Sequence, residues 1–368
     1  MTGPFHLFVD ISSHGLGHLA ITAPVLNALA ERCPGLRLTL RTALPGVVLR
    51  RRLRPPFTLV ATASDFGYVM RDALTIDLDA SAAAYRQAHA DWPRRVNAEA
   101  AWLAALAPDG VLSNVSYLPL AGAAQAGIPA AALCSLNWAD LFAHFFGNRE
   151  WAAAIHAEIL AAYRSAALFL RATPGMPMAD LGNVVSVGPI AARGKRCDLG
   201  LGAGVRSILV ALGGIAHRLP VDAWPRLEGI RWLVPAAWNC RHPDALASES
   251  LGLDFPDLVA SVDALIGKPG YGTFTEAACN GTPVLFQRRD DWPEQACLID
   301  WLQEQGPSRE VSGAALASGQ IAGPLGELLA FRRSSGISAS GGEAAAEQLL
   351  QLINGQVSRP TGIAITRA

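Results

Sequence analysis

The chain lacks several features that would assign it to a class directly. Its six cysteines form no C-x-x-C pair and mostly lie in apolar surroundings, as buried free thiols do, so we expect a reduced, cytoplasmic protein. No apolar run reaches the roughly 18 residues that cross a bilayer. No basic segment precedes an apolar stretch at the amino terminus, so we expect no signal peptide. The net charge of −1 gives no general attraction to nucleic acid.

Charged residues are also scarce, at 17% of the 368 residues, whereas hydrophobic residues make up 51%. A chain of this length and composition can bury a large core, and two domains are expected rather than one. Nothing in the composition indicates disorder on the scale of a domain.

A strand, a glycine turn, a helix and a second strand follow one another near the amino terminus. Residues 5–11 form an apolar strand, and Ser12-Ser13-His14-Gly15-Leu16-Gly17-His18 is the turn, called here the first glycine turn. An alanine-rich helix with a buried stripe is expected over residues 19–32, and a strand over 36–42.

The same succession returns between Ala264 and Phe286. A buried strand end is followed by Gly267-Lys268-Pro269-Gly270-Tyr271-Gly272, called here the second glycine turn. A helix is expected over residues 273–280, and Gly281 ends it before the strand at 284–286. Such a turn presents free backbone N–H groups at a helix start, which is a suitable place for a diphosphate.

The sequence of the second turn also has a purely structural explanation, as an alternative to a diphosphate site. Thr273 and Glu276 have the T-x-x-E spacing of a capping box, in which each side chain satisfies an amide at the helix start. The glycines would then serve only to make a tight turn.

Strand and helix patterns alternate through the rest of the chain, which predicts two doubly wound α/β domains. We expect a Rossmann-like domain over residues 1–187, a linker rich in Gly, Arg, Lys and Ala over 188–206, and a second Rossmann-like domain over 207–341. A helix and tail are expected over 342–368, and this segment is a candidate to pack back on the first domain. Ligands in such sheets bind at the carboxyl ends of strands, so the two turns should face each other across a cleft.

Gly15-x-Gly17-x-x-Ala20 also matches a dinucleotide fingerprint, which would indicate a dehydrogenase. That fingerprint asks for an acidic residue at the end of the second strand, where this chain has Arg41-Thr42. An arginine there is compatible with the 2′-phosphate of NADP.

Two further short patterns are less informative. The arginines of residues 50–54 beside Val47-Val48-Leu49 leave contact with an anionic membrane open, although a solvated helix end is the more typical interpretation. Asp77-Leu78-Asp79 resembles a metal-binding D-x-D but has no neighbouring ligands, so no metal is assigned.

Taken together, these motifs resemble the GT-B fold glycosyltransferases, in particular MurG-like and UDP-glucuronosyltransferase-like enzymes. The resemblance rests on residues 267–284, on the acidic and glutamine-containing segment 290–295, and on the first glycine turn. Val187-Gly188-Pro189 resembles the interdomain hinge of that family, and Leu212-Gly213-Gly214 a second phosphate-side loop. Lys268-Pro269 departs from the family pattern and is more similar to the glycosyltransferase-like segment of L-arabinokinase-type proteins.

The resemblance implies roles for individual residues. The diphosphate would be held by the second turn and by the phosphate-side loop, with Lys268 available to neutralise charge. Glu276 would bind the ribose hydroxyls, and the sugar hydroxyls would contact Glu294 and Gln295. The implied binding residues are Gly15, Gly17, Gly213, Gly214, Lys268, Gly270, Tyr271, Gly272, Thr273, Glu276, Glu294 and Gln295.

The expected reaction is transfer of a sugar from a nucleoside-diphosphate sugar, in particular a UDP-sugar, to an unknown acceptor hydroxyl. The nucleotide-sugar is a substrate, no cofactor is expected, and helix dipoles would take the place of a metal. The base candidates are His18 and His14, because a histidine titrates in the right range. A nucleotide-sugar hydrolase or epimerase on the same fold, or a non-catalytic nucleotide-sugar-binding module, remain alternatives.

Overall fold

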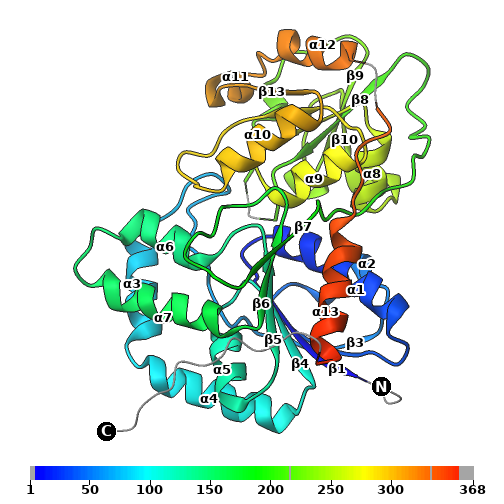
Figure 1. The fold of residues 1–368 in the computed structure, drawn as a ribbon. Helices are drawn as coiled ribbons and strands as arrows, with labels where there is room; N and C mark the ends of the chain where they lie inside the picture. Colours follow the sequence, from blue (N-terminus) through cyan, green and yellow to red (C-terminus); the bar gives the residue numbers. More distant parts are fainter. Residues whose placement is uncertain (1–4, 215–216, 332–333, 356–368) are drawn as a thin grey trace, which may run out of the picture.

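The computed structural model describes residues 5–214, 217–331 and 334–355. They form two α/β domains, each built on a sheet of parallel strands, one above the other in Figure 1. The sheet of the N-terminal domain has the strand order β3-β2-β1-β4-β5-β6-β7, and that of the C-terminal domain β10-β9-β8-β11-β12-β13. The N-terminal strands are β1 (His6–Ile11), β2 (Arg37–Arg41), β3 (Phe57–Val60), β4 (Gly110–Asn114), β5 (Ala130–Cys134), β6 (Leu168–Ala172) and β7 (Val184–Val187). The C-terminal strands are β8 (Arg206–Ala211), β9 (Ile230–Val234), β10 (Ala245–Ala247), β11 (Ala264–Gly267), β12 (Val284–Phe286) and β13 (Ser308–Glu310). The doubly wound architecture expected from the sequence is therefore confirmed.

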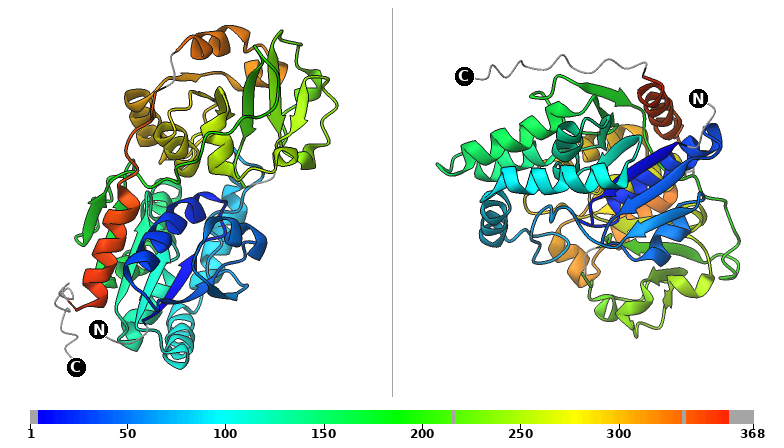
Figure 2. Two further views of the ribbon diagram at one scale, coloured as in Figure 1. Left: turned by 90° about the vertical axis from the view of Figure 1, so that its right-hand side faces the viewer. Right: turned by 90° about the horizontal axis from the view of Figure 1, so that it is seen from below.

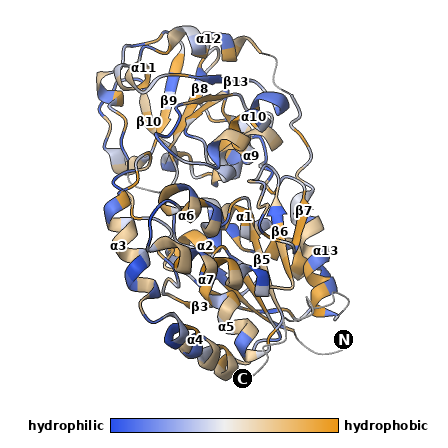
Figure 3. Ribbon diagram, turned by 60° about the vertical axis from the view of Figure 1, so that its left-hand side comes forward, coloured by the Kyte–Doolittle hydropathy of each residue, from blue (hydrophilic) through white to orange (hydrophobic). Residues whose placement is uncertain are grey.

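Buried central strands explain why the sequence shows short, continuous apolar runs. Every residue of β1, β4, β5, β11 and β12 is buried, as in parallel sheets covered by helices on both faces. Figure 3 shows hydrophobic strands between helices of mixed hydropathy. The helices of the N-terminal domain are α1 (Gly17–Arg32), α2 (Gly46–Arg52), α3 (Leu78–His89), α4 (Trp92–Leu106), α5 (Leu118–Ala126), α6 (Trp138–Phe146) and α7 (Ala152–Ser165). Those that follow are α8 (Phe255–Ser261), α9 (Tyr271–Cys279), α10 (Gln295–Gln305), α11 (Gly313–Ser318), α12 (Ala322–Ala330) and α13 (Gly341–Ile353).

Two successive helices, α3 and α4, cover most of residues 78–106. Asp91 accepts a hydrogen bond from the amide of Arg94 and so caps α4, and Pro93 occupies its first turn. Proline is accepted there because the first amides of a helix have no partner within it. The sequence pattern did not predict β3, α6 or the short edge strands β10 and β13.

The last described helix lies against the first domain. Helix α13 packs beside α1, as the two views of Figure 2 show. A Cβ on Gly341 would lie 1.9 Å from the carbonyl oxygen of Gly188, so the helix start approaches the interdomain segment closely. No helix or strand is assigned between Val187 and Arg206.

Candidate functional site

The first glycine turn joins β1 to α1 at the carboxyl end of the sheet and positions His18 in the first turn of the helix. His18 is buried, and its Nδ1 lies 2.9 Å from Oδ1 of Asn114, at the end of the neighbouring strand β4. The amide nitrogen of Asn114 donates to the carbonyl of His18 and to Thr22, so Oδ1 is the atom left to accept from His18. The proton therefore sits on Nδ1, and Nε2 carries the lone pair of a base.

His14 lies in the same turn but in a different setting. Its ring stacks on Trp292 of the C-terminal domain, with centroids 5.7 Å apart, and meets Trp138 edge-on. Its Nε2 is buried without a hydrogen-bond partner. Burial, followed by the nearby positive groups, lowers the pKa of His14 to about 3, and burial lowers the pKa of His18 to about 4. Both rings are therefore neutral near pH 7.

Gly15 and Gly17 shape the first turn. Gly15 has a φ of +89°, which favours glycine, and Gly17 is the first residue of α1. A Cβ at either position would meet no atom within 4 Å, so open space adjoins both glycines.

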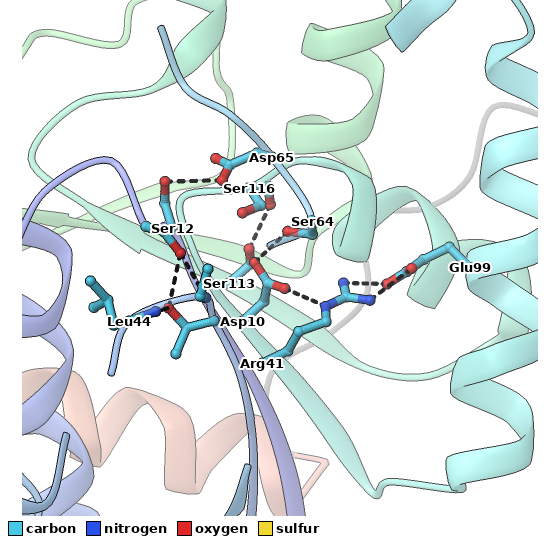
Figure 4. Close-up of polar contacts among 12 residues, drawn as sticks. Asp10, Ser12, Arg41, Leu44, Ser64, Asp65, Glu99, Ser113 and Ser116 are labelled. Carbon is cyan, nitrogen blue, oxygen red and sulfur yellow. Dashed lines mark hydrogen bonds and ion pairs between the residues drawn. The ribbon is translucent and has the colours of Figure 1, made fainter. Parts of the chain in front are cut away.

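Arg41 is the residue on which an NADP site would depend, and it is engaged elsewhere. Its guanidinium is buried between Asp10, at 2.6 Å, and Glu99, at 2.6 Å, as Figure 4 shows. All of its charge is thus directed at two carboxylates of its own domain. In this arrangement Arg41 does not offer its guanidinium to a 2′-phosphate, because the buried network holds the side chain.

A half-buried carboxylate, that of Asp65, lies beside the same network. Asp65 accepts hydrogen bonds from the hydroxyl of Ser12 and from the indole of Trp138 (Figure 4 shows the former). Burial, followed by the charge of Asp10, raises the pKa of Asp65 to about 6. Asp65 was not predicted as part of the site, and it supports the first turn through Ser12.

The second glycine turn joins β11 to α9. This helix begins at Tyr271 with Gly270 as its N-cap, and no side chain caps it. The capping box proposed for Thr273 and Glu276 is therefore wrong: the helix starts two residues earlier than expected, and Thr273 lies half-buried within its first turn. No side chain caps the start of α1 either.

The first turns of α1 and α9 lie directly against each other. A Cβ on Gly272 would lie 2.6 Å from the Cβ of Ala20, and a Cβ on Gly214 would lie 2.7 Å from Leu16 Cγ. Glycine is required at both positions because the two domains approach so closely. Two helix N-termini, each with partial positive charge, thus converge on one region of the interface between the domains.

Lys268 lies between the glycine loops of the C-terminal domain. Its Nζ would be 3.9 Å from a Cβ on Gly213 and 4.0 Å from one on Gly270. Burial, followed by the charge of Arg289, lowers the pKa of Lys268 to about 7. Gly213 has a φ of +90°, so this loop too requires glycine.

Tyr271 does not direct its side chain toward the expected diphosphate position. Its hydroxyl donates to the carbonyl of Thr173, at 3.0 Å, and accepts from the amide of Ile190, at 2.9 Å. The ring is buried, and the side chain ties the start of α9 to the segment between the domains. Only the backbone of Tyr271 remains available to the turn.

Glu276 is paired across the domain interface. Its buried carboxylate accepts from Arg52, at the end of α2, with the closer contact at 2.5 Å. Burial raises the pKa of Glu276, and Arg52 opposes that rise. A ribose at this carboxylate would share it with Arg52 or displace the guanidinium.

Glu294 and Gln295 are both engaged in protein contacts. Glu294 accepts from Ser135 of the N-terminal domain, at 2.6 Å, and from the indole of Trp292, at 3.1 Å. The amide of Gln295 forms two hydrogen bonds with the backbone of Arg289. Their side chains shape the loop before α10, and a sugar bound there would share or replace these contacts.

The structure adds Asn114, Trp292 and Arg289 to the site. Arg289 is 6% exposed, and its guanidinium lies over the ring of Trp292, 3.9 Å from the centroid. Trp292 stands in the segment that carries the resemblance, so its place in the motif was a usable signal. Nothing in the sequence distinguishes Arg289 from its neighbour Arg288.

Two further observations concern the described ranges of the chain. No group of three or more His, Cys, Asp or Glu residues there could hold a metal ion, and Asp77 caps α3 by accepting from the amide of Ala80. No helix in the same ranges is both long enough and apolar enough to cross a membrane. All six cysteines are free thiols.

The chain was compared with protein families, with curated proteins and with solved structures. No protein-family model matches the chain. It is 26% identical to an L-arabinokinase of Arabidopsis thaliana over 370 residues, which cover 94% of this chain and 34% of the relative. The chain thus spans about a third of the curated relative it matches.

Solved structures of similar fold are glycosyltransferases. The calicheamicin glycosyltransferase CalG4 matches with a TM-score of 0.59 and 16% identity, over 98% of this chain and 96% of CalG4. LpCGTa in complex with UDP matches with the same TM-score and identity, over 98% of this chain and all of LpCGTa. The resemblance to GT-B fold glycosyltransferases is confirmed at the level of the fold.

Proposed function

We propose that the protein is an enzyme, a glycosyltransferase that moves a sugar from a nucleoside-diphosphate sugar to an acceptor hydroxyl. UDP is the favoured nucleotide, and no metal ion is needed. The observation that carries the proposal is the convergence, at the carboxyl ends of β1 and β11, of two uncapped helix starts with Lys268 and with the lone pair of His18. Solved neighbours of this fold, one of them a complex with UDP, agree with this assignment.

The geometry suits the charges that develop during glycosyl transfer. The bond between the anomeric carbon and the diphosphate breaks, and the diphosphate keeps the electron pair. Aligned amides and helix dipoles stabilise that growing negative charge more in the transition state than in the ground state. His18 Nε2 takes the proton of the acceptor hydroxyl as its oxygen bonds to the anomeric carbon.

A thermal-shift screen tests the nucleotide. We expect UDP or another nucleoside diphosphate to raise the melting temperature and NADPH to leave it unchanged, because Arg41 is held by two carboxylates. Stabilisation by NADPH alone would overturn the proposal.

Hydrolysis by the same site is the second candidate, because His18 can equally activate a water molecule. Incubation of UDP-sugars with and without candidate hydroxyl acceptors separates the two. A transferase releases UDP faster when an acceptor is present, whereas a hydrolase releases it at one rate.

A further inference from the structure

The loop between β12 and α10 belongs to the C-terminal domain but is fastened to the other domain. Thr75 donates to Asp290 at 2.9 Å, His144 lies 3.0 Å from Asp291, and Ser135 donates to Glu294 at 2.6 Å. Three hydrogen bonds therefore fix this loop, and the residues it carries, against the N-terminal domain.

Arg289 is the one arginine within the described ranges whose side chain has buried nitrogen atoms without a hydrogen-bond partner. These atoms are Nε and Nη2, and the side chain is more than nine-tenths buried. The adjacent Arg288 is exposed and binds Glu310, at 2.9 Å. Burying an unpaired charge is costly, and such a group in a folded protein requires an explanation.

Charges of both signs surround Arg289. Glu294 and Asp72 attract it, but Asp72 already accepts hydrogen bonds from the amides of Leu74 and Thr75. The charges of Lys268 and Arg289 repel each other, and both act on His14. The nearby carboxylate of Glu294 already accepts from Ser135 and Trp292. The buried Nε and Nη2 of Arg289 still lack a hydrogen-bond partner, and with Lys268 and two helix starts nearby they form a site that an anion completes.

We propose that Arg289 is a further catalytic residue, which binds the diphosphate of the donor together with Lys268 and stabilises it as the leaving group. This inference rests on the proposed function and adds a residue that the sequence motif did not indicate. As the bond from the anomeric carbon to the diphosphate oxygen breaks, negative charge accumulates on that oxygen. The planar guanidinium binds two phosphate oxygens at once, which the ammonium of Lys268 cannot do.

The test compares Arg289→Gln with Arg288→Gln, which neutralise two neighbouring arginines of which only Arg289 is buried. Binding of UDP, inorganic pyrophosphate and uridine is measured by calorimetry, together with release of UDP from a UDP-sugar. We expect Arg289→Gln to lose at least thirtyfold in affinity for UDP and pyrophosphate, with no change for uridine. The turnover number should fall about 10²-fold, and Arg288→Gln should match the parent within twofold.

The outcomes separate this inference from the proposed function. If the parent binds UDP and Arg289→Gln binds UDP and pyrophosphate equally well, the role of Arg289 is overturned while the proposed function stands. A loss confined to a UDP-uronate, with UDP unchanged, also overturns it, because Arg289 would then read a sugar carboxylate. If the parent binds pyrophosphate through Arg289 but no nucleoside diphosphate, the proposed function fails and the anion contact stands.

Arg289→Lys provides a folded alternative if the glutamine variant does not fold. Arg289→Lys keeps the positive charge but loses the planar guanidinium that binds two oxygens at once, so we expect an intermediate loss of about tenfold in UDP affinity. Parent-like affinity for UDP in Arg289→Lys would contradict two-point binding by the guanidinium.

Discussion

The two glycine turns have the same strand–turn–helix structure but carry side chains of different charge. The first turn carries neutral histidines, and His18 is fixed as a single tautomer by Asn114. The second turn and its loop carry cations, Lys268 and Arg289, with no hydrogen-bond partner for the buried Nε and Nη2 of the latter. A turn whose base is held in place suits proton transfer, whereas a turn and loop with unpaired, buried guanidinium nitrogens suit an anion. The comparison suggests that each domain contributes one half of the reaction.

The Arg52–Glu276 ion pair, which joins the two domains, should give the largest effect, and that effect is on stability. Glu276→Gln leaves Arg52 charged beside a buried neutral amide, which should lower the free energy of unfolding by about 3 kcal/mol. Chemical denaturation measures this loss. Glu31→Gln is the matched control, because Glu31 and Arg54 form an exposed pair worth about 0–1 kcal/mol. Equal stability of the two variants would show that the turns are held together by packing alone.

Removing the base should separate the two turns functionally. His18→Ala is expected to lower the turnover number by about 10²-fold and leave UDP affinity nearly unchanged, because the first turn serves the acceptor. UDP release from a UDP-sugar and calorimetric binding of UDP measure the two properties. His156→Ala is the control, because His156 lies on α7 and stacks on Phe142 within the N-terminal domain. A parallel loss of UDP affinity in His18→Ala would place His18 at the donor instead.

The pH dependence of UDP binding should report the titration of Lys268 in the second turn, and we expect it to be the smallest effect. The pKa of Lys268 is lowered to about 7, so above that pH the free protein must take up a proton to bind the diphosphate. UDP affinity should therefore fall by up to about tenfold per pH unit above pH 7. Lys268→Met should abolish this slope between pH 7 and 9, whereas His18→Ala should retain it. A flat profile in the parent would mean that Lys268 does not meet the diphosphate.

The same shift has a consequence for the free protein. The unfolded chain binds the Lys268 proton up to its ordinary pKa of 10.5, whereas the folded chain releases it near 7. Since the unfolded state binds more protons in that window, this group makes stability rise with pH between about 7 and 10.5. Lys268→Met should remove that contribution.

Local sequence determined the architecture and the places where the turns occur. Apolar runs bounded by glycine predicted the βαβ unit around His14 to His18 and the one around Lys268 to Gly272, because buried strands and tight turns depend on neighbouring residues. The helix boundary was less certain: the spacing of Thr273 and Glu276 resembled a capping box, yet α9 begins at Tyr271. Spacing alone does not reveal the backbone angles that decide where a helix starts.

Tertiary structure alone decided the partners of the charged groups. Glu276 meets Arg52, which lies 224 positions away in the chain, and Arg41 is held between Asp10 and Glu99. Arg288 and Arg289 are adjacent in sequence, yet one binds an exposed carboxylate and the other is buried without a partner for its Nε and Nη2. The physical reason is that the energy of a charge depends on its burial and on the groups brought near it, and the packing of distant segments sets both.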